Sequence, residues 1–466
     1  MQFSSGIFLM LFLPLTMGIY KIGGVLLGHR FKNIVLLLAS LLFYAWGEPL
    51  FIFMLILGIG VNYVIGLKIE KNEQNKKMLL IASLIFNLGI LFVFKYLSFA
   101  TKELSRGITI TPVNIALPIG ISFYTFQIMS YVFDVYYGKV PAQKNVFSLA
   151  LYISMFPQLV AGPIVRYSDI ENEIHYRTET VDLFCEGTHR FIIGLAKKVL
   201  IADFLGGIAD KIFVTAEYSQ ISLVTAWIGA IAYTFEIYYD FSGYSDMAIG
   251  LGKCFGFHFK ENFDHPYISR SVTEFWRRWH ISLTDWFRDY VYIPLGGNRV
   301  SSNRHIFNLF VVWLLTGIWH GAEWTFIIWG MMYFTIQLVE KKTSIMERIP
   351  KVLGYVITMV VVVIGWTIFK ASNLQCALDY LKSMFGAGDG IVDSNSLLYA
   401  KSSAIVFAIS YVFTFPILDW IDHKITNKLG VTIKECLWIP VSAALLGLCL
   451  LVIINGSYSP FIYFNF

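Results

Sequence analysis

Long apolar segments recur along the whole chain and limit what it can fold into. A helix that crosses the hydrocarbon core of a membrane needs about 20 predominantly apolar residues, and it satisfies its backbone hydrogen bonds internally. Runs of this kind occupy residues 6–27, 33–47, 50–67, 78–98, 115–137, 145–165, 221–241, 306–319 with 323–339, 352–369, 397–418 and 434–455. The sequence therefore predicts an all-α polytopic membrane protein with about 11 transmembrane helices.

Charge content supports this prediction and excludes other classes of protein. Charged residues make up 14% of the 466 residues and apolar residues 56%, whereas soluble chains carry about 25% charged residues. The net charge of +5 is a small excess spread over many short loops, which excludes a basic nucleic-acid-binding protein. No basic region precedes the first apolar run, and no small-residue cleavage site follows it, so we expect 6–27 to be a retained helix.

The cysteines give no sign of a metal site. They are scattered, most of them inside apolar runs, and no Cys-x-x-Cys pair occurs among Cys185, Cys254, Cys376, Cys436 and Cys449. We therefore expect buried free thiols, no bound metal and no bound cofactor.

The chain is interpreted as a single integral-membrane domain, 1–466, in three parts. These are N-terminal helices over 1–112, a core over 113–340, and C-terminal helices with an aromatic tail over 341–466. Polar connections are expected at 166–190, 253–274 and 297–305. Two further segments, 272–294 and 372–385, are too charged to span and are predicted to lie along the membrane or dip into it.

Lysine and arginine residues predict the orientation in the membrane. The loop His29–Lys32 is basic and the segment Lys68–Lys77 carries four lysines, whereas Gly47–Pro49 between them carries none. Because cytoplasmic loops are enriched in these residues, we expect an outside N-terminus and cytoplasmic basic loops. Lys102 and Arg106 fall in a predicted outer loop and run against this assignment.

Two ionisable residues, His320 and Glu323, interrupt the apolar stretch from Ile306 to Val339. Polar groups at membrane depth are costly and mark functional sites by default. If the stretch is helical, a spacing of three places both side chains on one face. Gly317 and Gly321 would let another helix or a substrate approach the imidazole, which could act as a general base in acyl transfer. Position alone leaves open a histidine that only packs between helices.

A second histidine ends the segment Phe275–His280. Ser271 followed by Glu274 is a capping-box pattern, which predicts that a helix begins there. His280 falls on the apolar stripe of this helix, where a lone histidine is more often a packing residue.

Basic residues gather around this helix on the side predicted to be cytoplasmic. One interpretation is a site for the phosphates of an acyl carrier, helped by the backbone amides near Gly296 and Gly297. The other is the positive-inside bias together with anionic lipid headgroups. The candidates for donor binding are Trp276, Arg277, Arg278, Arg288 and Arg299.

Several motifs in a fixed order give the chain a family resemblance. They are Phe156–Ile164, Phe241–Gly250, Glu261–Phe263, Phe275–His280, Trp286–Tyr290, Tyr292–Arg299, Trp319–Gly321 and Pro460–Phe464. In this order the chain resembles the membrane-bound O-acyltransferase family. It is most similar to the bacterial branch that serves alginate and peptidoglycan O-acetylation.

The resemblance implies a ring of helices around a thinned centre, with a cytoplasmic and an extracellular funnel. It implies that His320 is the catalytic histidine and that His280 is a second functional position. Relatives often have asparagine where this chain has Glu323, which limits any direct role for that carboxylate. Other residues that the motifs place near the site are Trp319, Ser245 and Asp246.

The resemblance also implies the substrates and partners. Acetyl-CoA or another acyl thioester would be the donor on the cytoplasmic side of the bacterial inner membrane. The acceptor would be a cell-envelope polysaccharide, reached through an extracytoplasmic SGNH-type or serine-type O-acetyltransferase partner. Tyr463 in the aromatic tail could act as an acyl relay to His320, or the tail could only anchor at the interface.

Other functional classes remain open from the sequence. A transporter or proton-coupled channel could use His320 and Glu323 as a proton path, although such a path needs further acidic groups and the apolar runs contain few. A scaffold that recruits secreted enzymes, and an acyltransferase acting on a lipid or a lipidated protein, are further alternatives.

Overall fold

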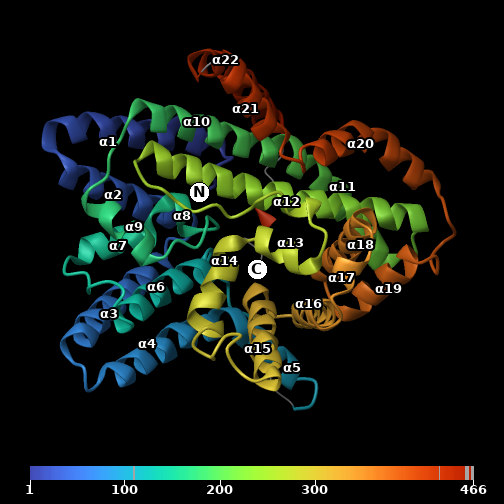
Figure 1. Cartoon of the computed structure of the whole chain (residues 1–466), viewed down its shortest axis with the longest axis horizontal. Coiled ribbons are helices and arrows are strands. Elements are labelled where there is room, and N and C mark those ends of the chain that lie inside the picture. The colour runs from blue at the N-terminus through green and yellow to red at the C-terminus, as the bar shows by residue number, and fades with distance from the viewer. Residues whose placement is uncertain (109–110, 430, 457–460, 463–466) are drawn as a thin grey trace. The chain divides into compact units, whose positions relative to one another are not determined.

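The computed structural model describes residues 1–108, 111–429, 431–456 and 461–462, and within these ranges the chain is helical without a single strand (Figure 1). A single β-bridge among the described residues pairs Phe263 with Trp279. The prediction of an all-α protein is confirmed.

The helices follow one another through short connections. The first part of the chain contains η1 (Phe8–Phe12), α1 (Leu13–Leu27), α2 (His29–Gly47), α3 (Ile52–Lys71), α4 (Lys76–Leu91), η2 (Phe92–Tyr96), α5 (Leu97–Leu104), α6 (Ile121–Tyr136), α7 (Val146–Ser154), α8 (Phe156–Leu159), α9 (Tyr167–His175) and α10 (Val181–Ala196). The second part contains η3 (Lys197–Ala202), α11 (Asp203–Tyr218), α12 (Leu223–Cys254), η4 (Pro266–Ile268), α13 (Val272–Arg278), α14 (Ile281–Phe287), η5 (Arg288–Tyr292), α15 (Ser302–His320), α16 (Trp324–Thr343), α17 (Ile345–Arg348), α18 (Lys351–Lys370), α19 (Leu374–Met384), α20 (Ser394–Val412), α21 (Ile417–Leu429) and α22 (Val431–Asn455).

Six helices of the described chain are long and apolar enough to cross a membrane. They cover Phe8–Leu27, His29–Gly47, Ile52–Lys71, Lys76–Leu104, Lys351–Lys370 and Leu437–Asn455. Each coincides with one of the predicted runs, whereas the total of about 11 stays a prediction. Helices α13, α14 and α19 lie where the sequence predicts short membrane-surface segments.

The chain packs as two compact units. Of the described residues, the first comprises those within Met1–Phe191, Tyr244–Glu261 and Ile453–Asn465, and the second comprises those within Ile192–Gly243 and Asn262–Val452. In the first unit α1 packs along α2, and α3, α4 and α6 pack together. In the second unit α15 packs along α16, and both α13 and α18 pack against α16.

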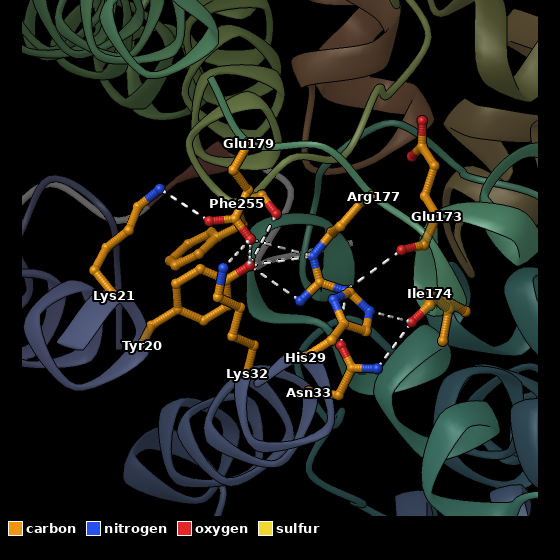
Figure 2. Close-up of polar contacts among 10 residues, drawn as sticks. All are labelled: Tyr20, Lys21, His29, Lys32, Asn33, Glu173, Ile174, Arg177, Glu179 and Phe255. Atoms are coloured by element: carbon orange, nitrogen blue, oxygen red, sulfur yellow. Dashed lines mark hydrogen bonds and ion pairs between the residues drawn. The ribbon is translucent and has the colours of Figure 1, made fainter. Parts of the chain in front are cut away.

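A buried arginine ties the N-terminal helices to the rest of the first unit (Figure 2). The Arg177 side chain is fully buried. Its guanidinium donates to the Tyr20 hydroxyl of α1 at 3.0 Å and to Asn33 Oδ1 of α2 at 2.7 Å, and it lies 4.6 Å from the Phe257 ring. A buried charge needs such partners, because an uncompensated one is strongly destabilising.

Glu179 balances part of this positive charge. Its carboxylate accepts hydrogen bonds from Tyr20 at 2.6 Å, Lys32 at 2.9 Å and Lys21 at 3.0 Å. Burial alone would raise the pKa of Glu179, but these hydrogen bonds outweigh burial and hold the pKa below its ordinary value. The cluster therefore stays charged and fixes α1 to the start of α2. The basic segment His29–Lys32, predicted as a loop, is the first turn of α2, because only Gly28 separates the two helices.

Glycines set the close approach of α15 and α16, so we expect Gly317→Ala to destabilise the protein by about 1–3 kcal/mol, the usual cost of overpacking. A Cβ atom at Gly317 would lie 2.6 Å from the backbone oxygen of Phe326, which cannot move without shifting α16. The thermal unfolding temperature in detergent measures the effect. Gly89→Ala in α4 is the matched control, because a Cβ there meets nothing within 4 Å. Equal unfolding temperatures for the two variants would contradict the packing argument.

Candidate active site

His320 is the last residue of α15 and lies inside an aromatic cage. The side chain is 3% exposed. Its ring meets the rings of Trp319, Trp329 and Phe369 edge-on, with centroid separations of 5.0, 5.0 and 5.3 Å. These rings come from α15, α16 and α18, so three helices of the second unit fix the position of the imidazole.

The prediction that His320 and Glu323 lie on one helix face is wrong. Helix α15 ends at His320, Gly321 is extended, and Glu323 is the N-cap residue of α16. Gly317 and Gly321 permit close helix approach, as predicted, whereas the approach of a substrate to the imidazole stays a prediction. The approaching groups are the backbone and the ring of Phe326 in α16.

His280 occupies a backbone turn between two short helices. Helix α13 begins after Ser271, whose side chain accepts from the Glu274 amide at 3.0 Å, so the predicted helix start is confirmed. The helix ends at Arg278, and His280 has a φ of 47°, in the left-handed region that non-glycine residues rarely adopt. The continuous apolar stripe predicted through His280 is therefore interrupted. Backbone bonds to residues 262–264 hold the turn.

Asn262 fixes the tautomer of His280. The Asn262 Oδ1 atom accepts from the Ser282 amide at 3.2 Å and from the Ser282 hydroxyl at 2.8 Å, which identifies it as the oxygen. His280 Nδ1 lies 3.1 Å from the same atom and must therefore donate its proton to it. In the neutral ring this leaves the lone pair on Nε2.

One indole connects the two histidines. The Trp319 ring lies 5.0 Å from the His320 ring and 5.9 Å from the His280 ring, centroid to centroid. Both histidines are buried, with exposed fractions of 3% and 1%. Two buried imidazoles that contact the same tryptophan ring are well placed to transfer protons to and from a reacting group.

A match to a family model identifies the class of protein. The model described as MBOAT, membrane-bound O-acyltransferase family, matches residues 138–378, just over half of the chain. The chain belongs to the membrane-bound O-acyltransferase family.

Three relatives agree with this assignment. A probable alginate O-acetylase AlgI of Pseudomonas aeruginosa is 46% identical over 401 residues, which cover 83% of this chain and 75% of the relative. The probable alginate O-acetylase AlgI of Azotobacter vinelandii is 40% identical over 507 residues and covers 100% of both chains. A peptidoglycan O-acetyltransferase of Helicobacter pylori is 33% identical over 527 residues, covering 100% of this chain and 97% of the relative. This chain is thus a multi-pass membrane O-acyltransferase.

The predicted donor-binding residues of the acyltransferase divide into three groups. Arg277 and Arg299 are exposed, and neither forms an ion pair with any described residue. Carboxylates already neutralise two others: Arg278 pairs with Glu274 at 3.1 Å and Asp264 at 3.5 Å, and Arg288 pairs with Asp285 at 2.6 Å and Asp289 at 2.7 Å. Trp276 is buried, and its ring lies 5.4 Å from that of Trp329, one of the rings around His320.

The remaining predicted residues lie in the first unit or outside the described residues. Ser245 is buried, and Asp246 accepts a 2.8 Å bond from Arg190, which also binds Glu261. Tyr463 lies outside the described residues. Within the described part of the chain, no three histidine, cysteine or acidic side chains cluster closely enough to hold a metal ion.

Sequence reasoning missed two elements of the candidate site. Asn262 stands in the motif Glu261–Phe263 without a role assigned to it, although a buried amide next to a turn is a sign of such a role. Phe369 lies 49 positions after His320 at the end of α18, and its contact with His320 depends on how α16 and α18 pack.

Asn262 offers a test of the tautomer. We expect Asn262→Ala to lower the transfer rate by about 10²-fold, because His280 Nδ1 and both Ser282 donors lose their acceptor. Asn262→Asp keeps an acceptor at the same place and should restore most of the rate, with a shifted pH profile because a carboxylate favours the charged imidazole. Rates measured from pH 5 to 9 separate the variants. Equal losses in both would contradict the proposed hydrogen-bonding role.

Proposed function

We propose that this acyltransferase moves an acetyl group from acetyl-CoA on the cytoplasmic side toward a hydroxyl of an extracytoplasmic cell-envelope polysaccharide. The names of the relatives support the acetyl group and the polysaccharide class. The observation that carries the proposal is the pair of buried histidines, His320 and His280, held on the ring of Trp319.

His320 is the general base in this proposal. It takes the proton from the acceptor hydroxyl while the oxygen attacks the thioester carbonyl. The new carbon–oxygen bond forms, the carbon–sulfur bond breaks, and the proton passes from the imidazolium to the departing CoA thiolate, which regenerates neutral His320. The Nδ1–H bond to Asn262 holds the His280 ring in place, the fixed ring orients the reactants, and the cage excludes competing water.

The charge pattern supports the direction of transfer. The basic segment His29–Lys32 and the lysines of 68–77 favour a cytoplasmic position, which places the N-terminus outside the inner membrane. Arg277 and Arg299 are the donor-binding candidates that carry no ion pair within the described chain, so they are the cations best suited to the CoA phosphates.

In the relay through the C-terminal tail, the hydroxyl acetylated at His320 is that of Tyr463. A hydroxyl of an extracytoplasmic SGNH-type or serine-type partner then attacks this ester, the tyrosyl C–O bond breaks as the new one forms, the proton returns to Tyr463, and the partner passes the acetyl group to the polysaccharide in the same way. Phe461, a described residue of the tail, is 2% exposed and its ring lies 4.7 Å from that of Tyr244, so this side chain packs inside the first unit. If the Tyr463 hydroxyl carries the acetyl group, Tyr463→Phe abolishes polysaccharide acetylation in cells, whereas Tyr458→Phe does not. Full acetylation in the Tyr463→Phe strain would exclude the relay.

The donor and acceptor are tested with the purified protein. Radiolabelled acetyl-CoA is incubated with alginate and peptidoglycan oligosaccharides, with and without a secreted partner candidate. We expect wild type to release CoA and label an acceptor, and His320→Ala to do neither. Equal labelling by both proteins would contradict the proposal.

A further inference from the structure

A lysine in η3 forms a buried ion pair that the catalytic proposal does not use. The Lys198 ammonium lies 2.7 Å from Asp240 Oδ1 of α12 and 2.6 Å from Asp203 Oδ1 of α11. The side chains of Lys198 and Asp240 are 5% and 1% exposed, whereas that of Asp203 is 26% exposed. All three residues belong to the second unit, which also holds both histidines of the candidate site.

Stability alone explains the pair of Lys198 and Asp240 poorly. Taking two charges out of water is costly, and well-packed apolar side chains of similar volume often stabilise a protein as well or better. A charged hydrogen bond differs from apolar packing because it is short and directional, so it holds the two groups in one geometry. The pair is therefore better suited to fixing the position of α12 than to stabilising the fold.

Helix α12 lies directly against η3 on the side of this ion pair. A Cβ atom at Gly243 would lie 2.7 Å from the Gly194 backbone oxygen and 3.2 Å from the Lys198 backbone nitrogen. Asp240 and Gly243 are three positions apart, so they lie on one face of α12. The ion pair and the close backbone contact together fix the distance of α12 from η3 and its rotation about its own axis.

The residue that follows Asp240 contacts the candidate site. Phe241 is fully buried, and its ring lies 4.7 Å from the His280 ring, at 87° to it, and 5.0 Å from the Phe263 ring. With 3.6 residues per turn, successive side chains of a helix point about 100° apart. Asp240 and Phe241 therefore extend from different sides of α12, and a rotation of the helix would move the Phe241 ring relative to His280.

We propose that Asp240 is a positioning residue for acyl transfer. Its ion pair with Lys198 holds α12 in the rotation that keeps Phe241 against the His280 ring. The inference rests on the proposed function, because that proposal gives His280 its part in the reaction. Asp240 contacts neither substrate nor reacting atoms in this role and acts only through Phe241.

Asp240→Asn in the full-length protein tests the proposal. The change removes the charge and keeps the shape of the side chain, and Lys198 retains Asp203, so no buried cation is left without a carboxylate. The assay is CoA release from acetyl-CoA with the acceptor oligosaccharide that wild type labels. We expect kcat to fall about tenfold with the KM for acetyl-CoA unchanged, because small displacements near the reacting groups lower the rate.

Asp203→Asn is the matched control. It removes the other carboxylate from the same lysine, but Asp203 belongs to α11 and does not precede Phe241 in the chain. We expect a near wild-type kcat for this variant. Equal losses of kcat in the two variants would overturn the proposal, because the effect would then come from the charge balance at Lys198.

A double-mutant cycle separates positioning from a general loss of stability. We expect Phe241→Leu to lower kcat about tenfold, and Asp240→Asn/Phe241→Leu to lower it no further, because both changes release the same ring. Independent effects would multiply to about 100-fold, which would overturn the proposal. Thermal unfolding temperatures show whether each variant is folded.

Two further comparisons complete the test. If Asp240→Asn does not fold, Lys198→Gln/Asp240→Asn replaces it, because it removes both buried charges and leaves only the partly exposed Asp203. The same loss of kcat is expected, and a wild-type kcat in the folded double variant would overturn the proposal. A wild-type kcat in His280→Asn would refute the part that the proposed function gives to His280. A lowered kcat in His280→Asn with a wild-type kcat in Asp240→Asn would refute only the positioning role.

Discussion

Replacing His320 by glutamine is expected to lower acetyl transfer by about 10³-fold, within the range of about 10²–10⁴ that general acid–base catalysis contributes. Glutamine has similar bulk and can fill much of the space among Trp319, Trp329 and Phe369, but it cannot accept a proton at neutral pH. The rate of CoA thiol release from acetyl-CoA, in the presence of an acceptor, measures the effect.

The control for this prediction is an exposed histidine of the same chain. His258 pairs with Glu173 at 2.7 Å, and its side chain is 53% exposed, so His258→Gln should retain a near wild-type rate. If the His320→Gln protein is folded and releases CoA within threefold of wild type, His320 is not the base.

His280→Asn is expected to lower the rate by about 10²-fold while leaving the fold intact. Asparagine tolerates the left-handed conformation that His280 adopts, so the substitution removes the imidazole without adding backbone strain. The ring that donates to Asn262 and meets Trp319 is lost, and the reactants lose a fixed partner. Steady-state kinetics should show a lower kcat, and the thermal unfolding temperature should stay that of the wild type.

The chain offers a closely matched control at His265. This histidine also has a left-handed φ, 44°, and its Nδ1 atom lies 3.1 Å from the Thr414 carbonyl oxygen. His265→Asn therefore makes the same chemical change on the same type of backbone, and we expect near wild-type kinetics. Equal losses in kcat for the two variants would show that the effect comes from the turn and not from the His280 ring.

Short sequence patterns predicted the structural features that depend only on residues close together in the chain. The apolar runs predicted the six long helices, Ser271 with Glu274 predicted the start of α13, and Gly317 predicted the tight helix contact. Each of these follows from a few neighbouring residues. His320 could be singled out because ionisable groups in apolar sequence are rare, whereas His280 was singled out only by the family resemblance.

Features that depend on distant segments could not be predicted in this way. The apolar stripe continues through His280, yet the helix breaks there because residues 262–264 bond to the backbone of the turn. The arginines suggested a wide anion site, but Arg278 also pairs with Asp264 from a separate segment, a partner that sequence spacing did not identify. The contact of Phe369 with His320 likewise exists only once α16 and α18 have packed.

The sidedness of transfer tests the central claim most directly. Proteoliposomes are selected in which the basic loops of the protein face outward. Labelled acetyl-CoA is added outside these vesicles, and acceptor oligosaccharide with any required partner is trapped inside. We predict labelled acceptor inside wild-type vesicles, no CoA inside, and no labelled acceptor with His320→Gln. Equal labelling by both proteins, or labelling that requires intact acetyl-CoA to enter the vesicles, would contradict acyl transfer across the membrane at His320.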